Sequence, residues 1–387
     1  MAGFLGDTFC VAPWTVHLVN PDGTTGLCCI NQKLRHDIVT GGPWTDSSVL
    51  HDAKKSMLNG SPVHGCEKCY DHEAVQRRSM RQDYNDLFGE RLNLRHLRDP
   101  RYNETSLFDL SLGTTCNQKC RICGPHYSTG WIRDAKQLTH LEWAHTNFAT
   151  DGMSDARDLV EIIESMARCA NPIHVELKGG EPLYMAPVRA LLTAMIEKGI
   201  HLNTAELKFI TNGTQHDMHL LDLLARFPAV NIGISIDATE AVYEYVRGSN
   251  LTWEECVEKW RRLRQLPNVT TLRLCNTIYA YNIFDLRRLR TWAMAELGAD
   301  TQMADAILHR PSYMQVDVLP RPLLTVAAEM LAADDPIRPY IIRCINSEPH
   351  EDKTVDRQRF VEFTRQLDAV RGESCAEVIP QLAPLFA

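Results

Sequence analysis

The stretch Thr115-Cys116-Asn117-Gln118-Lys119-Cys120-Arg121-Ile122-Cys123-Gly124-Pro125 carries three cysteines in a C-x3-C-x2-C spacing. No fourth cysteine lies close by in the sequence, whereas a closed structural metal site uses four protein ligands. A 4Fe-4S cluster held by three thiolates leaves one iron open, where a small molecule can bind and accept an electron. The spacing therefore indicates chemistry rather than a purely structural metal.

A competing interpretation is a helix that turns the three cysteines toward the core, because free cysteine is often buried. Gly124-Pro125 would end such a helix at once, and residues 110–113 before the triplet are typical of a strand that runs into a loop. We therefore predict that the three cysteines lie in a loop.

The triplet resembles the signature of the radical S-adenosylmethionine (radical SAM) superfamily. In that family three thiolates hold the cluster, and the amino and carboxylate groups of S-adenosyl-L-methionine (SAM) bind the fourth iron. The resemblance implies that one electron cleaves SAM to methionine and a 5'-deoxyadenosyl radical, which takes a hydrogen atom from the substrate. It also implies a reductant such as flavodoxin or ferredoxin. Ile122 stands where an aromatic residue often precedes the last cysteine, which could alter packing beside the adenine.

The composition permits a large globular core, since 44% of the 387 residues are hydrophobic and 23% are charged. No apolar run reaches the ~20 residues of a membrane span. Residues 1–7 lack the basic and apolar parts of a signal peptide. Thirteen cysteines without a secretory signal favour metal ligation in a reducing compartment, so we expect a cytoplasmic protein with no membrane contact.

The net charge of -8 excludes a strongly basic nucleic-acid footprint for the chain as a whole. One segment, residues 77–101, nevertheless carries seven arginines. A solvated helical face, paired with Asp83, Asp86 and Glu90, is the simpler interpretation. A phosphate-contacting strip is the alternative, and it keeps a nucleotide or nucleic-acid substrate open.

A second cysteine set lies near the N-terminus. Cys66 and Cys69 form a C-x2-C pair, and Cys10 and Cys28 flank the turn sequence Asn20-Pro21-Asp22-Gly23. Two strands joined by this turn would bring Cys10 and Cys28 together, and the later pair would complete a four-thiolate site. Such a site holds zinc or an Fe-S cluster, and the spacing does not distinguish them.

This spacing resembles the auxiliary-cluster part of SPASM and twitch domains, placed here before the radical SAM core rather than after it. The longer SPASM cysteine series is absent, so the resemblance implies the twitch type with one auxiliary 4Fe-4S cluster. Cys29 could replace Cys28, although the spacing from Gly23 favours Cys28. Fe-S is favoured over zinc because the neighbouring triplet already implies cluster loading.

Strands and helices alternate from about residue 105, as in a parallel α/β sheet or barrel. We expect six strands, at 106–112, 173–178, 205–211, 231–237, 270–278 and 313–319. Their apolar and polar residues alternate, so one face meets helices and the other lines an interior. Because a closed eight-stranded barrel packs its interior with mainly apolar side chains, a six-stranded partial barrel fits better, as the resemblance also implies.

The expected domains are an auxiliary-cluster region at 1–104, a radical SAM core at 105–320 and a helical C-terminal extension at 321–387. Within the core, Gly179-Gly180-Glu181-Pro182 follows the second strand, and its glycines permit close approach of the backbone to a ligand. A simple strand-to-helix turn is the structural alternative. After the triplet, this segment matches the family's GGEP motif, which contacts the amino group of SAM.

The resemblance assigns the ribose and carboxylate of SAM to residues of the later strands, namely Asn212, Ser235, Asp237 and Arg247. The structural alternatives are a turn at 211–213, a helix cap for Asp237 and a surface ion pair for Arg247. Substrate contacts are expected from Arg273 on strand five and from Gln315 and Asp317 on strand six, which have inward phase. The sequence leaves the substrate open between a peptide, a small metabolite and a nucleotide or nucleic-acid base.

A function of a different class is also consistent with the cysteines, namely a non-catalytic zinc- or Fe-S-binding module. The missing fourth cysteine beside the triplet and the segment 179–182 both argue against it.

Overall fold

The computed structural model describes residues 6–31, 33–37, 44–74, 76–141, 144, 156–170, 172–298, 302–347 and 353–387. The chain forms two compact units, each built from several segments. The first comprises Met1–Gly113, Asp151–Phe209 and Met218–Asn231. The second comprises Thr114–Thr150, Ile210–Asp217 and Ile232–Ala387.

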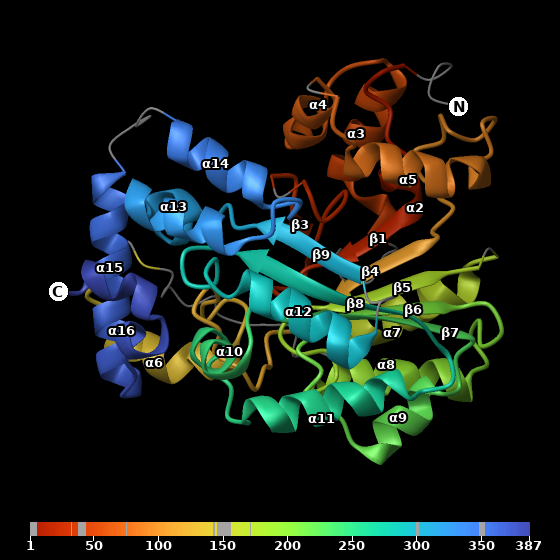
Figure 1. Cartoon of the computed structure of the whole chain (residues 1–387). Helices are drawn as coiled ribbons and strands as arrows, with labels where there is room; N and C mark the ends of the chain where they lie inside the picture. The colour runs from red at the N-terminus through yellow and green to blue at the C-terminus, as the bar shows by residue number, and fades with distance from the viewer. Residues whose placement is uncertain are drawn as a thin grey trace. The chain divides into compact units, whose positions relative to one another are not determined.

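A seven-stranded sheet has the order β1-β4-β5-β6-β7-β8-β9, and its two edge strands, β1 and β9, leave it open (Figure 1). The pairs β1–β4, β4–β5, β5–β6 and β8–β9 are parallel. The strands are β1 Val16–Val19, β4 Leu107–Ser111, β5 His174–Lys178, β6 Glu206–Thr211, β7 Ala229–Ser235, β8 Val269–Ile278 and β9 Gln302–Ile307. The expected α/β class, with a parallel sheet that does not close into a full barrel, is confirmed.

The first unit joins the N-terminal cysteine region to the first strands of the sheet. Its helices are α2 Ala12–Thr15, η1 Trp44–Asp46, α3 Ser48–Leu58, α4 Glu67–Ala74, α5 Met80–Phe88, η2 Gly89–Arg91, α7 Ala156–Arg168, α8 Ala186–Glu197 and α9 Met218–Leu224. A core of buried side chains, including Phe9, Trp14 and Phe88, packs this region. Helix α5 begins with a capping box of Ser79 and Gln82, which satisfies backbone N–H groups that a helix start leaves unpaired.

The predicted alternation of strand faces is visible in β5. Val175 and Leu177 are fully buried, whereas His174, Glu176 and Lys178 are half-buried. On the polar side, Lys178 pairs with Asp109 of β4 at 2.5 Å, and Lys208 of β6 pairs with Glu176 at 2.6 Å. Charged side chains therefore line the polar face of this part of the sheet, and they neutralise one another.

The turn at Asn20–Gly23 forms as predicted, with the Gly23 N–H donating to the Asn20 carbonyl at 2.9 Å. The expected two-stranded hairpin around it is wrong, because the flanking strands belong to different sheets. β1 pairs with β4, while β2 Thr24–Thr25 pairs with β3 His36–Asp37. The apolar segment of β1 is buried on both faces, which suits the main sheet better than an exposed hairpin.

The second unit contains the triplet loop, the last strands and the C-terminal helices. Its helices are η3 Thr129–Trp131, α6 Ile132–Gln137, α10 Glu240–Arg247, α11 Trp253–Arg264, α12 Leu286–Leu297, η4 Ser312–Met314, η5 Val316–Val318, α13 Arg321–Met330, α14 Arg338–Asn346, α15 Thr354–Arg371, α16 Cys375–Val378 and η6 Pro380–Leu385. None of the described helices is both long enough and apolar enough to cross a bilayer.

The predicted strand at 313–319 is wrong. These residues form two short 3-10 helices, η4 and η5, and the last strand of the sheet is β9 instead. Met314, Val316 and Val318 are all buried, so two successive tight turns reproduce the alternating burial that a strand would show. β9 was not predicted, because its residues do not alternate between apolar and polar and its side chains are half-exposed or exposed.

Candidate functional site

The triplet cysteines lie in the loop between β4 and η3, so the alternative of a helix turned toward the core is wrong. Cys120 is buried, and Cys116 and Cys123 are half-buried. The Cys123 N–H donates to the Cys120 carbonyl at 2.9 Å. The Gln118 N–H donates to the Cys116 sulfur at 3.4 Å. Backbone donors that face a sulfur favour its thiolate form, as metal ligation requires.

The pKa values of the Cys120 and Cys123 thiols shift in opposite directions. A hydrogen bond with Cys123, together with the positive charges of Arg247 and Arg371, lowers the pKa of Cys120 to about 7, although burial opposes this. The same hydrogen bond, followed by burial, raises the pKa of Cys123 well above its usual value, and the charge of Cys116 acts in the same direction. The three sulfurs therefore lie close enough to affect one another's charge.

Hydrogen bonds connect the cysteine loop to two of the residues predicted to bind SAM. Asn117 accepts from the Asn212 amide at 2.9 Å. Gln118 accepts from Nε of Arg247 at 3.3 Å. The sequence separations are 95 and 129 residues, so the fold, and not local spacing, makes these contacts.

Asp237 and Arg247, both expected at the SAM site, pair with each other. Nη1 of Arg247 lies 3.0 Å from Oδ2 of Asp237, and their side chains are 10% and 1% exposed. The Thr277 N–H donates to the other carboxylate oxygen of Asp237 at 2.9 Å. Arg247 thus forms an ion pair, as its structural alternative proposed, but the pair is buried beside the cysteine loop rather than on the surface.

Of the three residues expected to contact substrate, only Arg273 lies on a strand. Arg273 lies on β8 with the predicted phase, half-buried together with Cys275 and Thr277. Asp317 lies in η5 and pairs with Lys353 at 3.1 Å, while the Gln315 amide donates to the His309 carbonyl at 2.7 Å. Since neither residue is on a strand, the phase argument that placed Gln315 and Asp317 toward an interior is wrong. Ser235 is half-buried and is the last residue of β7, two residues before the predicted end of this strand, so Asp237 lies beyond it.

Tyr279 directly follows β8 and is fully buried. Its hydroxyl makes no hydrogen bond to any part of the chain that the structure describes. Burial raises the pKa of this hydroxyl well above its usual value, and so do the negative charges of Asp237 and Cys120. Strand alternation puts Tyr279 on the same face as Arg273, but nothing in the sequence shows that its hydroxyl lacks a partner among the described residues.

The GGEP segment, Gly179–Pro182, belongs to the first unit. Gly179 has φ 111°, and a Cβ there would lie 2.7 Å from the Gly113 carbonyl oxygen, so only glycine fits. The Gly180 N–H donates to the same carbonyl at 3.0 Å. Glu181 is fully buried and accepts from the Leu183 N–H at 3.0 Å. The turn that follows β5 is therefore fixed by close backbone contact.

The N-terminal cysteines of the first unit gather around one cavity. Cys10, Cys28, Cys66 and Cys69 all line it, whereas Cys29 is not among its lining residues. Burial, and then the charge of Cys28, raises the pKa of Cys10 well above its usual value, and Cys66 and Cys69 act in the same direction. Four mutually interacting sulfurs around a cavity fit a four-thiolate site, and the lining favours Cys28 over Cys29.

One asparagine, Asn31, and one glycine, Gly65, shape this cavity. Asn31 donates through its side chain to the Cys66 sulfur at 3.4 Å and to the His64 carbonyl at 2.9 Å. A Cβ on Gly65 would lie 2.3 Å from Oδ1 of Asn31. Nowhere in the described residues do three His, Cys, Asp or Glu side chains gather closely enough to hold a single metal ion. In a cluster, each thiolate binds a different iron, so its ligands need not meet at one point.

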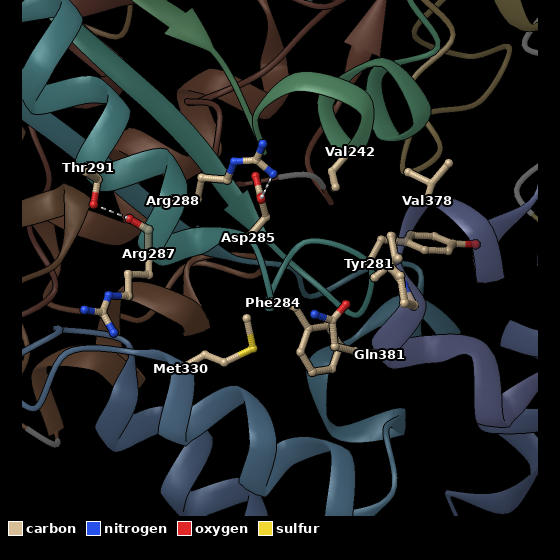
Figure 2. Close-up of a pocket in the computed structure, with 12 residues that line it drawn as sticks. Val242, Tyr281, Phe284, Asp285, Arg287, Arg288, Thr291, Met330, Val378 and Gln381 are labelled. Atoms are coloured by element: carbon tan, nitrogen blue, oxygen red, sulfur yellow. Dashed lines mark hydrogen bonds and ion pairs between the residues drawn. The ribbon is translucent and has the colours of Figure 1, made fainter.

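A cavity of about 550 Å³ lies elsewhere in the second unit, between α10, α12, α13 and the C-terminal segment (Figure 2). Phe284 and Met330 contribute apolar walls, and Asp285 and Arg288 face each other across 3.9 Å. Tyr281 is also among the lining residues, and its ring centroid lies 5.5 Å from the guanidinium carbon of Arg121 in the cysteine loop.

The arginine-rich segment 77–101 is largely occupied by partners. Arg78 pairs with Asp83 and Asp86, and Arg81 pairs with Glu73 in a nearly buried position. The Arg78 pairs follow the interpretation of a solvated, internally paired surface, whereas Arg81 is not solvated and its partner Glu73 lies outside the segment.

Comparison with known proteins identifies a domain in the middle of the chain. The model of the radical SAM superfamily matches residues 110–279. A comparison with curated proteins finds no match.

Three solved structures are similar to the chain. Native anSMEcpe with bound AdoMet is 14% identical at a TM-score of 0.40, over 58% of this chain and 58% of that one. SuiB of Streptococcus suis is 12% identical at a TM-score of 0.40, over 69% of this chain and 54% of that one. TYW1 with a lysine-pyruvate adduct bound is 15% identical at a TM-score of 0.31, over 59% of this chain and 70% of that one. The chain thus spans little more than half the length of anSMEcpe and SuiB. The family match covers residues 110–279, a little under half of this chain, and it identifies a radical SAM domain in that part of the sequence.

Proposed function

We propose that this chain cleaves SAM reductively at a 4Fe-4S cluster held by Cys116, Cys120 and Cys123, and that the resulting 5'-deoxyadenosyl radical takes hydrogen from a peptide or small metabolite. One observation carries the proposal: the loop with the three thiols is hydrogen-bonded to Asn212 and Arg247, which the family resemblance independently assigns to SAM. When bound, the cluster supplies the electron for this cleavage.

The donor set fits such a group. The Gln118 N–H already faces the Cys116 sulfur, and the lowered pKa of Cys120 favours a thiolate near neutral pH. Three protein sulfurs leave one coordination position for another ligand. The buried Tyr279 hydroxyl, near Asp237 and Arg247 and without a hydrogen bond to the described chain, offers a further donor to a polar ligand.

The remaining residues receive roles under the same proposal. Arg247, held by Asp237 through one guanidinium nitrogen, orients toward the carboxylate of SAM. Asn212, Ser235 and Asp237 contact its ribose, and Gly179, Gly180, Glu181 and Pro182 contact its amino group, following the family motif. Arg273 borders the substrate, supported by its phase on β8. Gln315 and Asp317 lose their support as substrate residues, because that support was a strand that does not form.

We further propose an auxiliary 4Fe-4S cluster on Cys10, Cys28, Cys66 and Cys69, supported by the single cavity that they line. Under this proposal, residues 1–104 serve as a twitch-like region, 105–320 as the catalytic core and 321–387 as an extension. The electron comes from a reductant such as flavodoxin or ferredoxin. A nucleotide or nucleic-acid substrate is the alternative to a peptide or small metabolite.

The test replaces Cys116, Cys120 and Cys123 with Ala and reconstitutes the protein anaerobically with iron and sulfide. We expect a loss of about four irons per chain relative to the wild type, together with the loss of 5'-deoxyadenosine formation from SAM. The matched control replaces Cys10, Cys28, Cys66 and Cys69, which should also lose about four irons but keep SAM cleavage. Continued cleavage of SAM by the triplet variant would overturn the proposal.

A further inference from the structure

Arg121 stands inside the cysteine triplet, between Cys120 and Cys123, and its side chain is 0% exposed. One terminal nitrogen, Nη2, lies 2.5 Å from Oδ1 of Asp368 and 2.5 Å from Oε2 of Glu373. Nε donates to the Tyr245 carbonyl at 3.1 Å. A buried guanidinium is tolerated only when it is paired and hydrogen-bonded. The conformation of the loop at Arg121 therefore depends on two carboxylates more than 240 residues later in the chain.

The end of α15 places these two carboxylates together. Gly372 has φ 68° and ends the helix in the left-handed conformation that glycine favours. This turn brings the Glu373 N–H to the Asp368 carbonyl at 3.0 Å. The Asp368 side chain is fixed in turn, because it accepts from the Tyr245 hydroxyl at 2.9 Å and from the Cys375 N–H at 2.7 Å.

A second arginine, Arg371 at the end of α15, holds the loop backbone. Nη2 of Arg371 donates to the Lys119 carbonyl at 2.7 Å, and its Nε donates to Asp134 at 2.8 Å. The guanidinium lies over the Trp131 ring, 4.8 Å from its centroid. Trp131 in turn donates to the Cys120 carbonyl at 2.8 Å. Two consecutive carbonyl groups of the cysteine loop are thus bound by side chains, one from α15 and one from η3.

The charges of this network cancel. Its cations are Lys119, Arg121 and Arg371, and its carboxylates are Asp134, Asp368 and Glu373. Although Arg371 also acts on the charge of Cys120, the hydrogen bonds of the network reach loop carbonyl groups rather than sulfurs, so we take its main effect on the loop to be geometric. Ligands that are held by fixed surrounding contacts bind metal more tightly than ligands that must be ordered on binding.

We infer that Arg121 and Arg371, through the end of α15, hold the cysteine loop in its cluster-binding conformation. Arg121 is a positioning residue, and the C-terminal extension is part of the cluster site rather than an appendage to it. This inference rests on the proposed assignment of a cluster to the triplet.

The test measures how fast iron leaves the triplet cluster. Anaerobically reconstituted Arg121→Met, Arg121→Lys and wild-type proteins are mixed with an iron chelator, and the reduced cluster that changes its electron paramagnetic resonance signal on SAM addition is followed over time. We expect Arg121→Met to release this iron ~10–100-fold faster, the range typical when a contact behind a ligand is removed. Arg121→Lys should behave almost as Arg121→Met, because lysine lacks the planar fork and the stacking surface.

Two further variants keep the test sharp. Arg365→Met removes an exposed arginine of the same helix, which donates to the Phe386 carbonyl, and it should match the wild type. Arg121→Met combined with Asp368→Asn and Glu373→Gln removes the buried charge imbalance, so it should fold yet still release iron quickly. Iron release at the wild-type rate in this triple variant, or in Arg121→Met alone, would overturn the inference.

The two proposals fail in different ways. A wild-type protein with no SAM-responsive cluster signal would overturn the proposed function, whatever the Arg121 variants do. A wild-type protein with that signal, together with an Arg121→Met variant that keeps its iron equally long, would overturn only the role of Arg121.

Discussion

Tyr279 and Tyr281 are both fully buried, two residues apart, and differ in one respect that can be measured. The Tyr281 hydroxyl lies 2.6 Å from the Thr364 hydroxyl, whereas that of Tyr279 has no hydrogen bond within the described residues. An unpaired buried polar group costs about 1–3 kcal/mol, and a normal buried hydrogen bond contributes about 0.5–1.5 kcal/mol. Replacing each tyrosine with Phe is the same chemical change, but we expect opposite effects on the cluster-free protein.

Tyr279→Phe should raise the free energy of unfolding of the cluster-free protein by about 1 kcal/mol, because it removes an unpaired hydroxyl. Tyr281→Phe should lower that free energy by a similar amount. If the Tyr279 hydroxyl serves a polar ligand, Tyr279→Phe should also weaken SAM binding about tenfold in the loaded protein, which corresponds to about 1.4 kcal/mol.

The assays are anaerobic urea unfolding of the cluster-free variants and equilibrium binding of SAM to the loaded ones. Equal destabilisation by both substitutions would show that the Tyr279 hydroxyl is already bonded within the protein, and it would refute the reasoning. Unchanged SAM affinity would remove Tyr279 from the binding site while leaving its stability effect intact.

Three further outcomes are expected. Gly65→Ala should lose the iron of the N-terminal cysteines, because the added Cβ would overlap Asn31. Gly60→Ala should keep this iron, because Gly60 also has a positive φ but no atom lies within 4 Å of its added Cβ. Colorimetric iron counts of the two variants test this difference. Asp237→Asn should lower the unfolding free energy of the cluster-free protein by about 3–5 kcal/mol, since it leaves a buried arginine unpaired. Asp86→Asn, at the exposed partner of Arg78, should leave the urea midpoint unchanged, and a shift there as large as that of Asp237→Asn would contradict the burial argument.

The sequence predicted the strands that carry the strongest pattern. Alternating apolar and polar residues placed five strands close to their observed positions, because side chains in a strand face opposite sides in turn. The same rule failed at 313–319, where two 3-10 turns also bury every second residue. It did not place β1, which was expected only as one arm of a hairpin, in the main sheet, and it missed β9, whose side chains are mostly half-exposed.

The same distinction between local pattern and folded contact applies to the site. Local spacing singled out the cysteines, and the structure brings Asn212 and Arg247, two residues expected to bind SAM, to the cysteine loop. No local pattern could reveal that Arg121 depends on Asp368 and Glu373, since charged residues in a helix are most often solvated. The unpaired Tyr279 hydroxyl was hidden for a different reason: it is defined by what surrounds it after folding, and not by its neighbours in the chain.

The long sequence separation between Arg121 and its partners has a consequence for biosynthesis. A ribosome that adds about 5–20 residues per second needs roughly 12–50 s to reach Asp368 after it has passed Arg121, a separation of 247 residues. Throughout that interval the nascent triplet has its three thiols but not the carboxylates that fix its shape. Under the proposed cluster assignment, iron delivered to the nascent chain would meet an unformed site. We therefore expect cluster insertion to follow synthesis of α15, and stalled or shortened chains should emerge from cells without iron at Cys116, Cys120 and Cys123.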